Sequence, residues 1–520
     1  MKKKVLAFLL CSAMAMSSLA GCGSADTTTT GTAASGAASG DAASAASSGA
    51  ADASASKSQG DMDTLALYIP SLATYSEDAI TEVQNAISDY TASKYGFKVS
   101  LHYTEIGNFE KAINLGMTTD EVDVTCYFNG SGQLSNYVSN GQLLDITDYF
   151  SKASDDLKNT FTDAEIQASS INGRMYGLVR KYQYGGKESV VMNKDIVSKM
   201  GIDPTTINSM DALGEVLYKV HQQYPDVYAM VPQSSADMTW CTPWVGGIGL
   251  TNFAYAEDTE STQAKSLFEL DSFAKFCSYT HKWYQDGLIM SDAISNTMEG
   301  SDLVSSGKAF CCLHNGDIDP LDKIYPNTVE SATVIAPKAI PTDIGNLQYG
   351  ISANSAHPDE SFTLLQALYT DPDLATLLAY GIKGEHYQIL ADGRADFPDG
   401  ITANNDPYGG FSATAVYPDF LIIPVKESAT YQDAKKTVED WDASVKVSKA
   451  FGYQFDTTKD TDFVTAYTNI ENKYKNALMT GSISLDDTLP SIQSELKSIG
   501  FYDKLAEVQT GLDKYLSENK

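Results

Sequence analysis

The sequence has few of the motifs that mark common enzyme classes. It contains six histidines, and none lies in HExxH or at another zinc-ligand spacing. GxSxG, P-loop and GxGxxG motifs are also missing from the chain. These absences argue against metallohydrolases, α/β-hydrolases and nucleotide-binding enzymes. A glycosidase with paired carboxylates stays open, because acidic residues are so abundant that a close pair carries little information.

Basic residues are scarce as well. The chain of 520 residues carries 36 Lys and Arg against 67 Asp and Glu, a formal net charge of −31 at pH 7. Nucleic acids and anionic lipid headgroups bind clustered Lys and Arg side chains, so this balance argues against both as partners. An acidic surface is typical of a soluble exported protein, and this length favours two or more lobes.

Cysteine is used sparsely, at seven positions, and no CxxC occurs. Two of the seven, Cys11 and Cys22, fall within the first 22 residues. The other five are an odd number that includes one adjacent pair, which is poor geometry for mutual pairing: Cys126, Cys241, Cys277, Cys311 and Cys312. We therefore expect mostly buried free thiols rather than a disulfide framework.

The N-terminal segment, residues 1–22, has the organisation of an export signal. Lys2, Lys3 and Lys4 precede an apolar run over residues 5–16, which is too short for a membrane-spanning helix. The run is followed by Leu-Ala-Gly-Cys at residues 19–22, which resembles the bacterial lipobox. That resemblance implies lipidation of Cys22, which becomes the mature N-terminus on the outer face of the cytoplasmic membrane. The alternative is an ordinary secretory signal with a chance cysteine.

Residues 23–61 consist almost entirely of Ala, Ser, Gly and Thr. Such a segment cannot bury enough apolar surface to offset the entropy of ordering, so we expect a disordered linker. Between a lipid anchor and a folded body, it would let the body reach ligand and partner while staying local.

Strand and helix patterns alternate where the folded body begins. The apolar run at residues 65–69 and the alternating pattern at 97–103 indicate strands, and residues 122–127 indicate a third. The spacing at 76–94 and 109–117 indicates helices. This order predicts a parallel α/β sheet. Ligands of such sheets bind beyond the carboxyl ends of the strands, which makes Tyr75, Tyr127 and Asn129 candidate ligand contacts.

Several motifs further along the chain occur in a familiar order. They are GQLLDITDYF at 141–150, INGRMYGL at 171–178, MNKDIV at 192–197, SGKAF at 306–310, VIAP at 334–337, ISANS at 351–355, DGRADFPDG at 392–400 and GFYDKLAEVQ at 500–509. Together they resemble the extracellular solute-binding proteins of ABC importers, family 1, which contains maltose-binding protein. The last two motifs are similar more narrowly to the LipO-type lipoproteins. The resemblance covers residues 64–512.

The resemblance implies a periplasmic-binding-protein-like α/β fold, with two α/β lobes joined by a hinge and a ligand cleft between them. The chain would cross near residues 178–184 and 333–340 and return near 384–389. Lobe one would then be residues 62–178 and 341–384, and lobe two would be residues 179–340 and 385–520. The implied function is capture of an oligosaccharide-type solute by hinge closure and its delivery to a membrane permease. The protein would act as a monomer without catalysis, cofactor or metal.

The aromatic residues favour a sugar as the solute. The chain has 30 tyrosines and four tryptophans, and aromatic rings stack on the C–H faces of sugars. Several of these have an ordinary alternative: a core position for the tryptophans and hinge packing for the tyrosines of the first crossing. Gly316 and Asp317, which follow the candidate pair after an apolar strand, are typical of a plain turn. The candidates from this reasoning are Trp240, Trp244, Tyr182, Tyr184, His314, Asn315, Tyr408 and Tyr453.

Three other functions remain open from the residues alone. A tyrosine-lined cleft also suits a peptide or another polar solute. A surface glycoside hydrolase is a more distant possibility, and turnover of a bound oligosaccharide would distinguish it from transport. A structural adhesin is the fourth, and it predicts no thermal shift with a small ligand.

Overall fold

The computed structural model describes residues 62–71, 75–129, 133–182, 184–233, 238, 242–316, 327–345, 347–402, 405–409 and 431–518. The export signal, Cys22, the linker over residues 23–61, Cys241 and Trp240 lie outside these ranges. Asn315 lies in a strand, but its side chain is also outside the described part. All described residues belong to one unit, Gly60–Lys520, which contains two large hydrophobic cores and one small buried cluster.

The first sheet forms the centre of lobe one. Its five strands run in the order β2 (Lys98–Glu105), β1 (Thr64–Ser71), β3 (Val124–Tyr127), β12 (Gln348–Ile351) and β6 (Leu178–Val179). The strand β1 pairs in parallel with β2 and with β3, which confirms the predicted parallel α/β sheet. The strand β12 comes from much later in the chain and is antiparallel to both of its neighbours.

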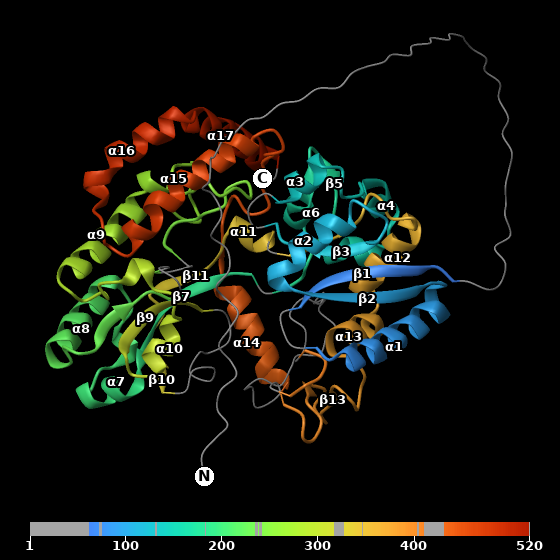
Figure 1. Ribbon diagram of the computed structural model, residues 1–520, viewed down its shortest axis with the longest axis horizontal. Coiled ribbons are helices and arrows are strands. Elements are labelled where there is room, and N and C mark those ends of the chain that lie inside the picture. The colour runs from blue at the N-terminus through green and yellow to red at the C-terminus, as the bar shows by residue number, and fades with distance from the viewer. Residues whose placement is uncertain are drawn as a thin grey trace, which may run out of the picture. The chain divides into compact units, whose positions relative to one another are not determined.

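Helices cover this sheet, and the sequence of the first one explains where it begins and ends and which face it buries. The helix α1 (Glu77–Tyr95) starts at Ser76, whose side chain accepts a hydrogen bond from the backbone of Ala79, and it ends at Gly96 with a left-handed φ of 86°. It buries Val83 and Ile87 on one face. Figure 1 shows α1 and α13 (Pro372–Tyr380) alongside β1 and β2. The remaining elements of this lobe are α2 (Ile106–Gly116), α3 (Gln133–Ser139), α4 (Thr147–Lys152), α5 (Asp155–Thr160), α6 (Asp163–Ala168), the hairpin β4 (Ser170–Ile171) and β5 (Arg174–Met175), and α12 (Pro358–Thr370).

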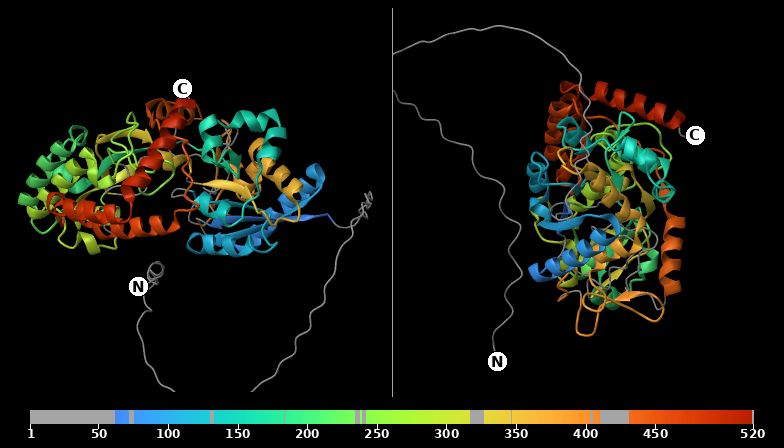
Figure 2. Two further views of the ribbon diagram at one scale, coloured as in Figure 1. Left: turned by 90° about the horizontal axis from the view of Figure 1, so that it is seen from above. Right: turned by 90° about the vertical axis from the view of Figure 1, so that its right-hand side faces the viewer.

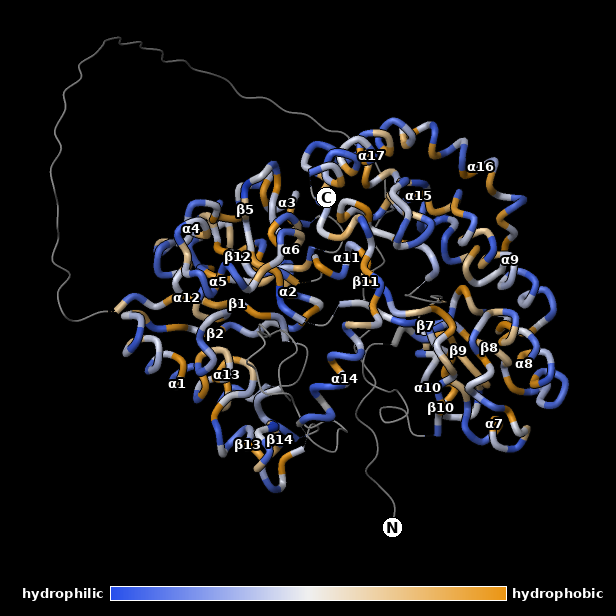
Figure 3. The backbone as a smooth tube through the Cα atoms, turned by 180° about the vertical axis from the view of Figure 1, so that it is seen from behind, coloured by the Kyte–Doolittle hydropathy of each residue, from blue (hydrophilic) through white to orange (hydrophobic). Residues whose placement is uncertain are grey.

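The second sheet forms the centre of lobe two. Its strands run in the order β15 (Lys446–Val447), β11 (Ile335–Ala339), β7 (Gly186–Asn193), β9 (Ala309–Gly316) and β8 (Tyr228–Val231), and β10 (Thr328–Glu330) also pairs with β7. Figure 3 shows the hydrophobic character of β8 and β9, whose side chains include the fully buried Met230 and Phe310. The helices that follow in this lobe are α7 (Lys194–Met200), α8 (Met210–Gln223), α9 (Asp271–Gln285) and α10 (Gly300–Ser305), with 3-10 turns at Pro204–Thr206, Leu267–Glu269 and Ala293–Ser295.

Three long helices at the C-terminus pack on the second core. They are α15 (Thr461–Met479), α16 (Leu485–Ser498) and α17 (Phe501–Glu518). Tyr467, Phe501 and Leu512 are fully buried in this core. Figure 2 shows these helices, coloured red, against the green segments around α9.

The chain passes between the sheets more than once, and the positions differ partly from expectation. The first passage follows β6 and precedes β7. The second lies at residues 340–347 and includes α11 (Pro341–Ile344), because β11 still belongs to the second sheet. A return of the chain to lobe two was expected near residues 384–389, and the contacts of this segment contradict it. The hairpin β13 (Gln388–Ile389) and β14 (Ala395–Asp396) packs near α13, and Tyr408 lies in the first core, so this part of the chain stays with lobe one. The helix α14 (Tyr431–Ser444) then leads to β15, which rejoins the second sheet.

Other expectations concern thiols, metals and membrane spans. Cys126, Cys277, Cys311 and Cys312 are buried free thiols, which confirms the expectation for these four. Within the described ranges, no group of three or more His, Cys, Asp or Glu side chains could hold a metal ion. In the same ranges, no helix combines the length and apolar character needed to cross a membrane.

Candidate functional site

Three tyrosines meet at the carboxyl ends of β1 and β2. The rings of Tyr75 and Tyr103 are stacked with centroids 4.3 Å apart, and Tyr408 meets Tyr75 edge to face at 5.5 Å. The hydroxyls of Tyr103 and Tyr408 share a hydrogen bond of 2.9 Å. Two of the predicted ligand contacts, Tyr75 and Tyr408, therefore lie together, although 333 positions of chain separate them.

The tyrosine cluster, Tyr75, Tyr103 and Tyr408, is part buried and part open. Tyr408 is fully buried, and its hydroxyl also reaches the carbonyl of Leu378 at 3.2 Å. Burial raises the pKa of Tyr408, so its phenol stays protonated at neutral pH. Tyr75 and Tyr103 are only half-buried. Gly409 follows Tyr408 at φ 79°, where a Cβ atom would come within 2.3 Å of the Tyr75 ring.

Tyr127 and Asn129 have structural partners instead of open surfaces. Tyr127 is 0% exposed, and its hydroxyl donates to Oε1 of Gln348 at 2.9 Å. The structure contradicts the prediction that Tyr127 contacts a ligand, because β12 and the core enclose its ring. Asn129 is also fully buried, and its Oδ1 accepts a hydrogen bond from the backbone of Leu134 in α3 at 2.8 Å.

The tyrosines of the first passage bind neighbouring segments. The rings of Tyr182 and Tyr184 meet edge to face at 4.9 Å, and the hydroxyl of Tyr182 donates to the carbonyl of Asp343 in α11. The hydroxyl of Tyr184 donates to Oε1 of Glu165 at 2.8 Å. Burial, and next the Glu165 carboxylate, raise the pKa of Tyr184. These contacts correspond to hinge packing, the ordinary alternative for both residues.

Glu165 was not among the predicted site residues. It is 2% exposed and accepts hydrogen bonds from four groups: Lys181, Tyr184 and both the backbone and hydroxyl of Thr162. Thr162 and Glu165 form a capping box at the start of α6. The Thr-x-x-Glu pattern was visible in the sequence, but nothing in it indicated that the same carboxylate holds the first passage.

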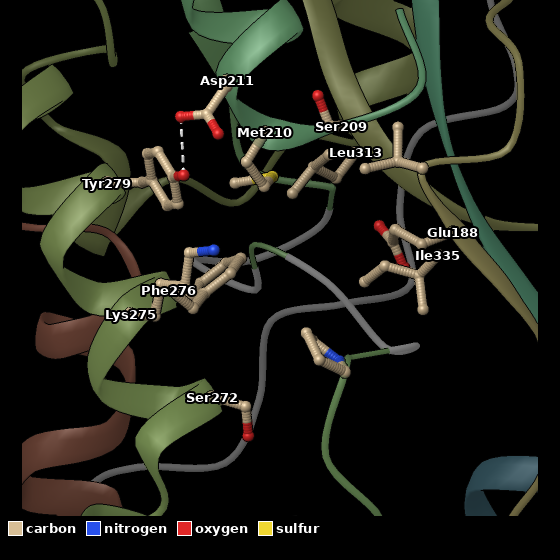
Figure 4. Close-up of a pocket in the computed structure, with 12 residues that line it drawn as sticks. Glu188, Ser209, Met210, Asp211, Ser272, Lys275, Phe276, Tyr279, Leu313 and Ile335 are labelled. Carbon is tan, nitrogen blue, oxygen red and sulfur yellow. Dashed lines mark hydrogen bonds between the residues drawn. The ribbon is translucent and has the colours of Figure 1, made fainter. Parts of the chain in front are cut away.

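Lobe two contains a pocket of about 210 Å³ between the second sheet and two of its helices. Figure 4 shows its lining. Met210, Phe276, Leu313 and Ile335 supply apolar walls. At one side the Tyr279 hydroxyl donates to Oδ1 of Asp211 at 2.7 Å. The pocket can enclose an apolar ring or ring face next to a polar edge.

Trp244 lies near this pocket but not in its lining. Its ring meets Phe273 and Phe276 edge to face at 5.2 and 5.8 Å, and the side chain is 5% exposed. This burial corresponds to the core position that was the alternative for Trp244. It contradicts the prediction that the loop presents this ring to a ligand. The neighbouring Pro243 is exposed and lines the pocket.

The last candidates are His314, Asn315 and Tyr453. His314 and Asn315 do not follow the strand as expected; β9 extends through both, which pair with Ser189 and Glu188 of β7. Tyr453 is 5% exposed, and its hydroxyl donates to the carbonyl of Val508 in α17 at 3.1 Å. No contact of the described residues joins Tyr453 to the tyrosine cluster.

Comparison with known protein families identifies the family to which the chain belongs. The model of the bacterial extracellular solute-binding protein family matches residues 85–384, more than half of the chain. This chain belongs to the bacterial extracellular solute-binding proteins. A second model, described as a domain of unknown function (DUF3502), matches residues 449–517, which include the C-terminal helices α15, α16 and most of α17.

Individual relatives agree with this family. A carbohydrate ABC transporter substrate-binding protein from Streptococcus pneumoniae serotype 4 is 24% identical over 466 residues, which cover 85% of this chain and 89% of the relative. The crystal structure of the N-glycan transport solute binding protein NgtS from Streptococcus pneumoniae has a TM-score of 0.72 and 21% identity, covering 88% of this chain and all of NgtS. NgtS in complex with Man5GlcNAc has a TM-score of 0.63 and 20% identity over 88% of this chain and 99% of NgtS. These likenesses establish the two-lobe α/β fold of the solute-binding proteins.

Proposed function

We propose that this solute-binding protein captures an oligosaccharide outside the cell and delivers it intact to the permease of an ABC importer. The match to the extracellular solute-binding protein family supports a role in solute transport. The sugar class is supported by the S. pneumoniae relative, a carbohydrate transporter component, and by NgtS, whose structure holds Man5GlcNAc. Members of the family are transport proteins, so the expected chemistry is binding without bond cleavage.

The tyrosine cluster supports a sugar ligand on lobe one. Tyr75 and Tyr103 are half-buried aromatic rings at the carboxyl end of the parallel strands, where ligands of α/β sheets bind. A sugar ring could stack on such an aromatic surface. Trp240, which lies outside the described residues, stays a candidate contact from lobe two.

Closure of the lobes is the proposed mechanism. A solute that touches both lobes gains those contacts only in the closed state, so binding shifts the population towards closure. The closed surface then docks on the permease. Lipidation at Cys22, proposed from the lipobox, would hold the protein at the outer face of the membrane, and two acyl chains suffice for stable anchoring.

A thermal-shift screen tests the proposed solute class. Mature protein is mixed with neutral oligosaccharides, including mannose–N-acetylglucosamine glycans, and with peptides of similar size. A ligand that binds only the native state raises Tm. We expect a saturable shift with a glycan, and recovery of that glycan unaltered after incubation. A shift with peptides alone would contradict the sugar class, and shortened glycan products would contradict transport without catalysis.

The anchor is tested separately with the substitution Cys22→Ser. Wild-type protein made in a bacterial host should take up labelled palmitate and sediment with membranes, whereas Cys22→Ser should do neither. Cys11→Ser is the matched control, since Cys11 lies inside the signal segment and should be removed with it. Equal labelling of all three proteins would contradict lipidation at Cys22.

A further inference from the structure

The pocket of lobe two lies at the end of the second sheet that is next to the first passage between the lobes. The strands β8 and β9 are parallel, and the carboxyl end of β9 pairs with the first residues of β7, which directly follow that passage. Glu188 and Leu313, near this end, line the pocket together with the starts of α8 and α9. Ligands of α/β sheets bind beyond the carboxyl ends of the strands. The pocket is therefore placed to take part of a solute held between the lobes.

The walls of this pocket are apolar, and a ligand can reach them. Met210 and Ile335 are half-buried, and Phe276 and Leu313 behind them are buried. The volume of about 210 Å³ exceeds the ~150 Å³ of an engineered apolar cavity that holds benzene. A hydroxyl group placed against such walls would give up its hydrogen bonds to water without replacement. The walls therefore favour an apolar substituent over a bare hydroxyl.

Two groups of opposite charge lie at one side of the pocket. Asp211 on α8 accepts a hydrogen bond of 2.7 Å from the hydroxyl of Tyr279 on α9, and Nζ of Lys275 lies 5.9 Å from the centroid of the Tyr279 ring. Figure 4 shows these three side chains along the same side. Asp211 and Lys275 are exposed, whereas Glu188, the third charged residue of the lining, is 1% exposed. The accessible polar groups thus offer one anionic acceptor and one cationic donor beside the apolar walls.

We propose that this pocket binds the acetamido group of an N-acetylated amino sugar within the oligosaccharide. The methyl group of the substituent packs against Met210 and Ile335. Its N–H donates to the carboxylate of Asp211, and its carbonyl oxygen accepts from the ammonium group of Lys275. A hexose with a hydroxyl in place of this substituent leaves the apolar walls unfilled. The inference rests on the proposed oligosaccharide function and adds the class of sugar that lobe two selects.

Titration calorimetry with two matched disaccharides tests this assignment. N,N′-diacetylchitobiose and cellobiose have the same β-1,4-linked rings and differ at carbon 2, where an acetamido group replaces a hydroxyl. The mature chain with Cys22→Ser should bind N,N′-diacetylchitobiose saturably and cellobiose at least about tenfold more weakly. Equal affinities, or no binding of N,N′-diacetylchitobiose, overturn the assignment. If another oligosaccharide still raises Tm in that case, the proposed oligosaccharide function stands without it, whereas both fail if no oligosaccharide binds.

Variants of Lys275 separate recognition from folding. Lys275→Met removes the donor at an exposed position and should weaken binding of N,N′-diacetylchitobiose about tenfold, with Tm of the free protein unchanged. Lys275→Arg keeps a cationic donor and should bind like the wild type. Lys497→Met is the matched control, since this exposed lysine of α16 is not among the residues that line the pocket. Wild-type affinity in Lys275→Met, or an equal loss in Lys497→Met, contradicts the proposal.

Peptides contain the same amide chemistry and provide the opposing outcome. N-acetylalanine methylamide carries an acetamido group without a sugar ring. We expect its binding to be weaker than that of N,N′-diacetylchitobiose, because it lacks the rings that the rest of the site contacts. Tighter binding of N-acetylalanine methylamide that is lost in Lys275→Met would assign the pocket to peptides and overturn the proposal.

Discussion

Removing the carboxylate of Glu165 should lower the stability of the folded protein. Glu165 caps α6 through Thr162 and accepts hydrogen bonds from Lys181 at 2.6 Å and Tyr184 at 2.8 Å. Both partners lie on the first passage between the lobes. Glu165→Ala therefore loosens a helix start and the segment that leads to lobe two at the same time.

The expected loss of stability depends on how deeply Glu165 and Lys181 are buried. Breaking a fully buried ion pair costs about 3–5 kcal/mol, because the remaining charge loses its partner. The Lys181 side chain is 24% exposed while Glu165 is 2% exposed, so water can solvate the ammonium group in part. Loss of the capping box adds about 1 kcal/mol. We take about 2 kcal/mol for the ion pair after this partial solvation, so Glu165→Ala should lower the free energy of unfolding by about 3 kcal/mol.

Urea denaturation of the mature chain measures this value. Glu439→Ala is the control, because its pairing with Lys435 spans 3.9 Å between two exposed side chains on α14 and should contribute less than about 1 kcal/mol. Equal stability of Glu165→Ala and Glu439→Ala would show that the buried carboxylate stabilises the fold no more than the exposed one. Glu165→Gln provides a second check: it keeps an acceptor for Thr162 but removes the charge, so its loss should lie between the two.

Three further predictions concern other parts of the molecule. Trp244→Ala should destabilise the protein by about 3–5 kcal/mol in thermal or urea unfolding, since the indole is core; a stable variant that loses only ligand affinity would contradict this. Burial raises the pKa of Asp343 from 3.8 to about 6, so the folded state binds the proton more tightly and stability falls as pH rises through that window. Asp343→Asn should flatten this part of the pH dependence, and an unchanged profile would contradict it. Tyr408→Phe removes the hydrogen bond to Tyr103 and should cost about 1 kcal/mol by urea denaturation; no loss would contradict the contribution of that bond.

The sequence predicted local structure well where a pattern of neighbouring residues decides it. The strand over residues 64–71 buries Leu65, Leu67 and Ile69, and the helix that follows has its capping serine and its terminal glycine in place. The order of strands and helices then gave the parallel sheet of lobe one.

Long-range contacts explain what could not be predicted. Tyr127 looked like a strand-end residue at a ligand site, but β12, more than 200 residues later, covers it. Trp244 lies in a loop with proline and glycine neighbours, which indicates a turn and says nothing of burial. The return between lobes was misplaced because the bridge between Tyr75 and Tyr408 holds the segment around Tyr408 on lobe one.

Small-angle X-ray scattering with a bound oligosaccharide tests whether the two lobes close on the solute. A glycan identified by thermal shift is added to saturation, and scattering is compared with that of the free protein. Capture by lobe closure predicts a smaller radius of gyration in the complex, with the glycan recovered unaltered. An unchanged scattering curve with a tightly bound glycan would show that the lobes do not close on the solute.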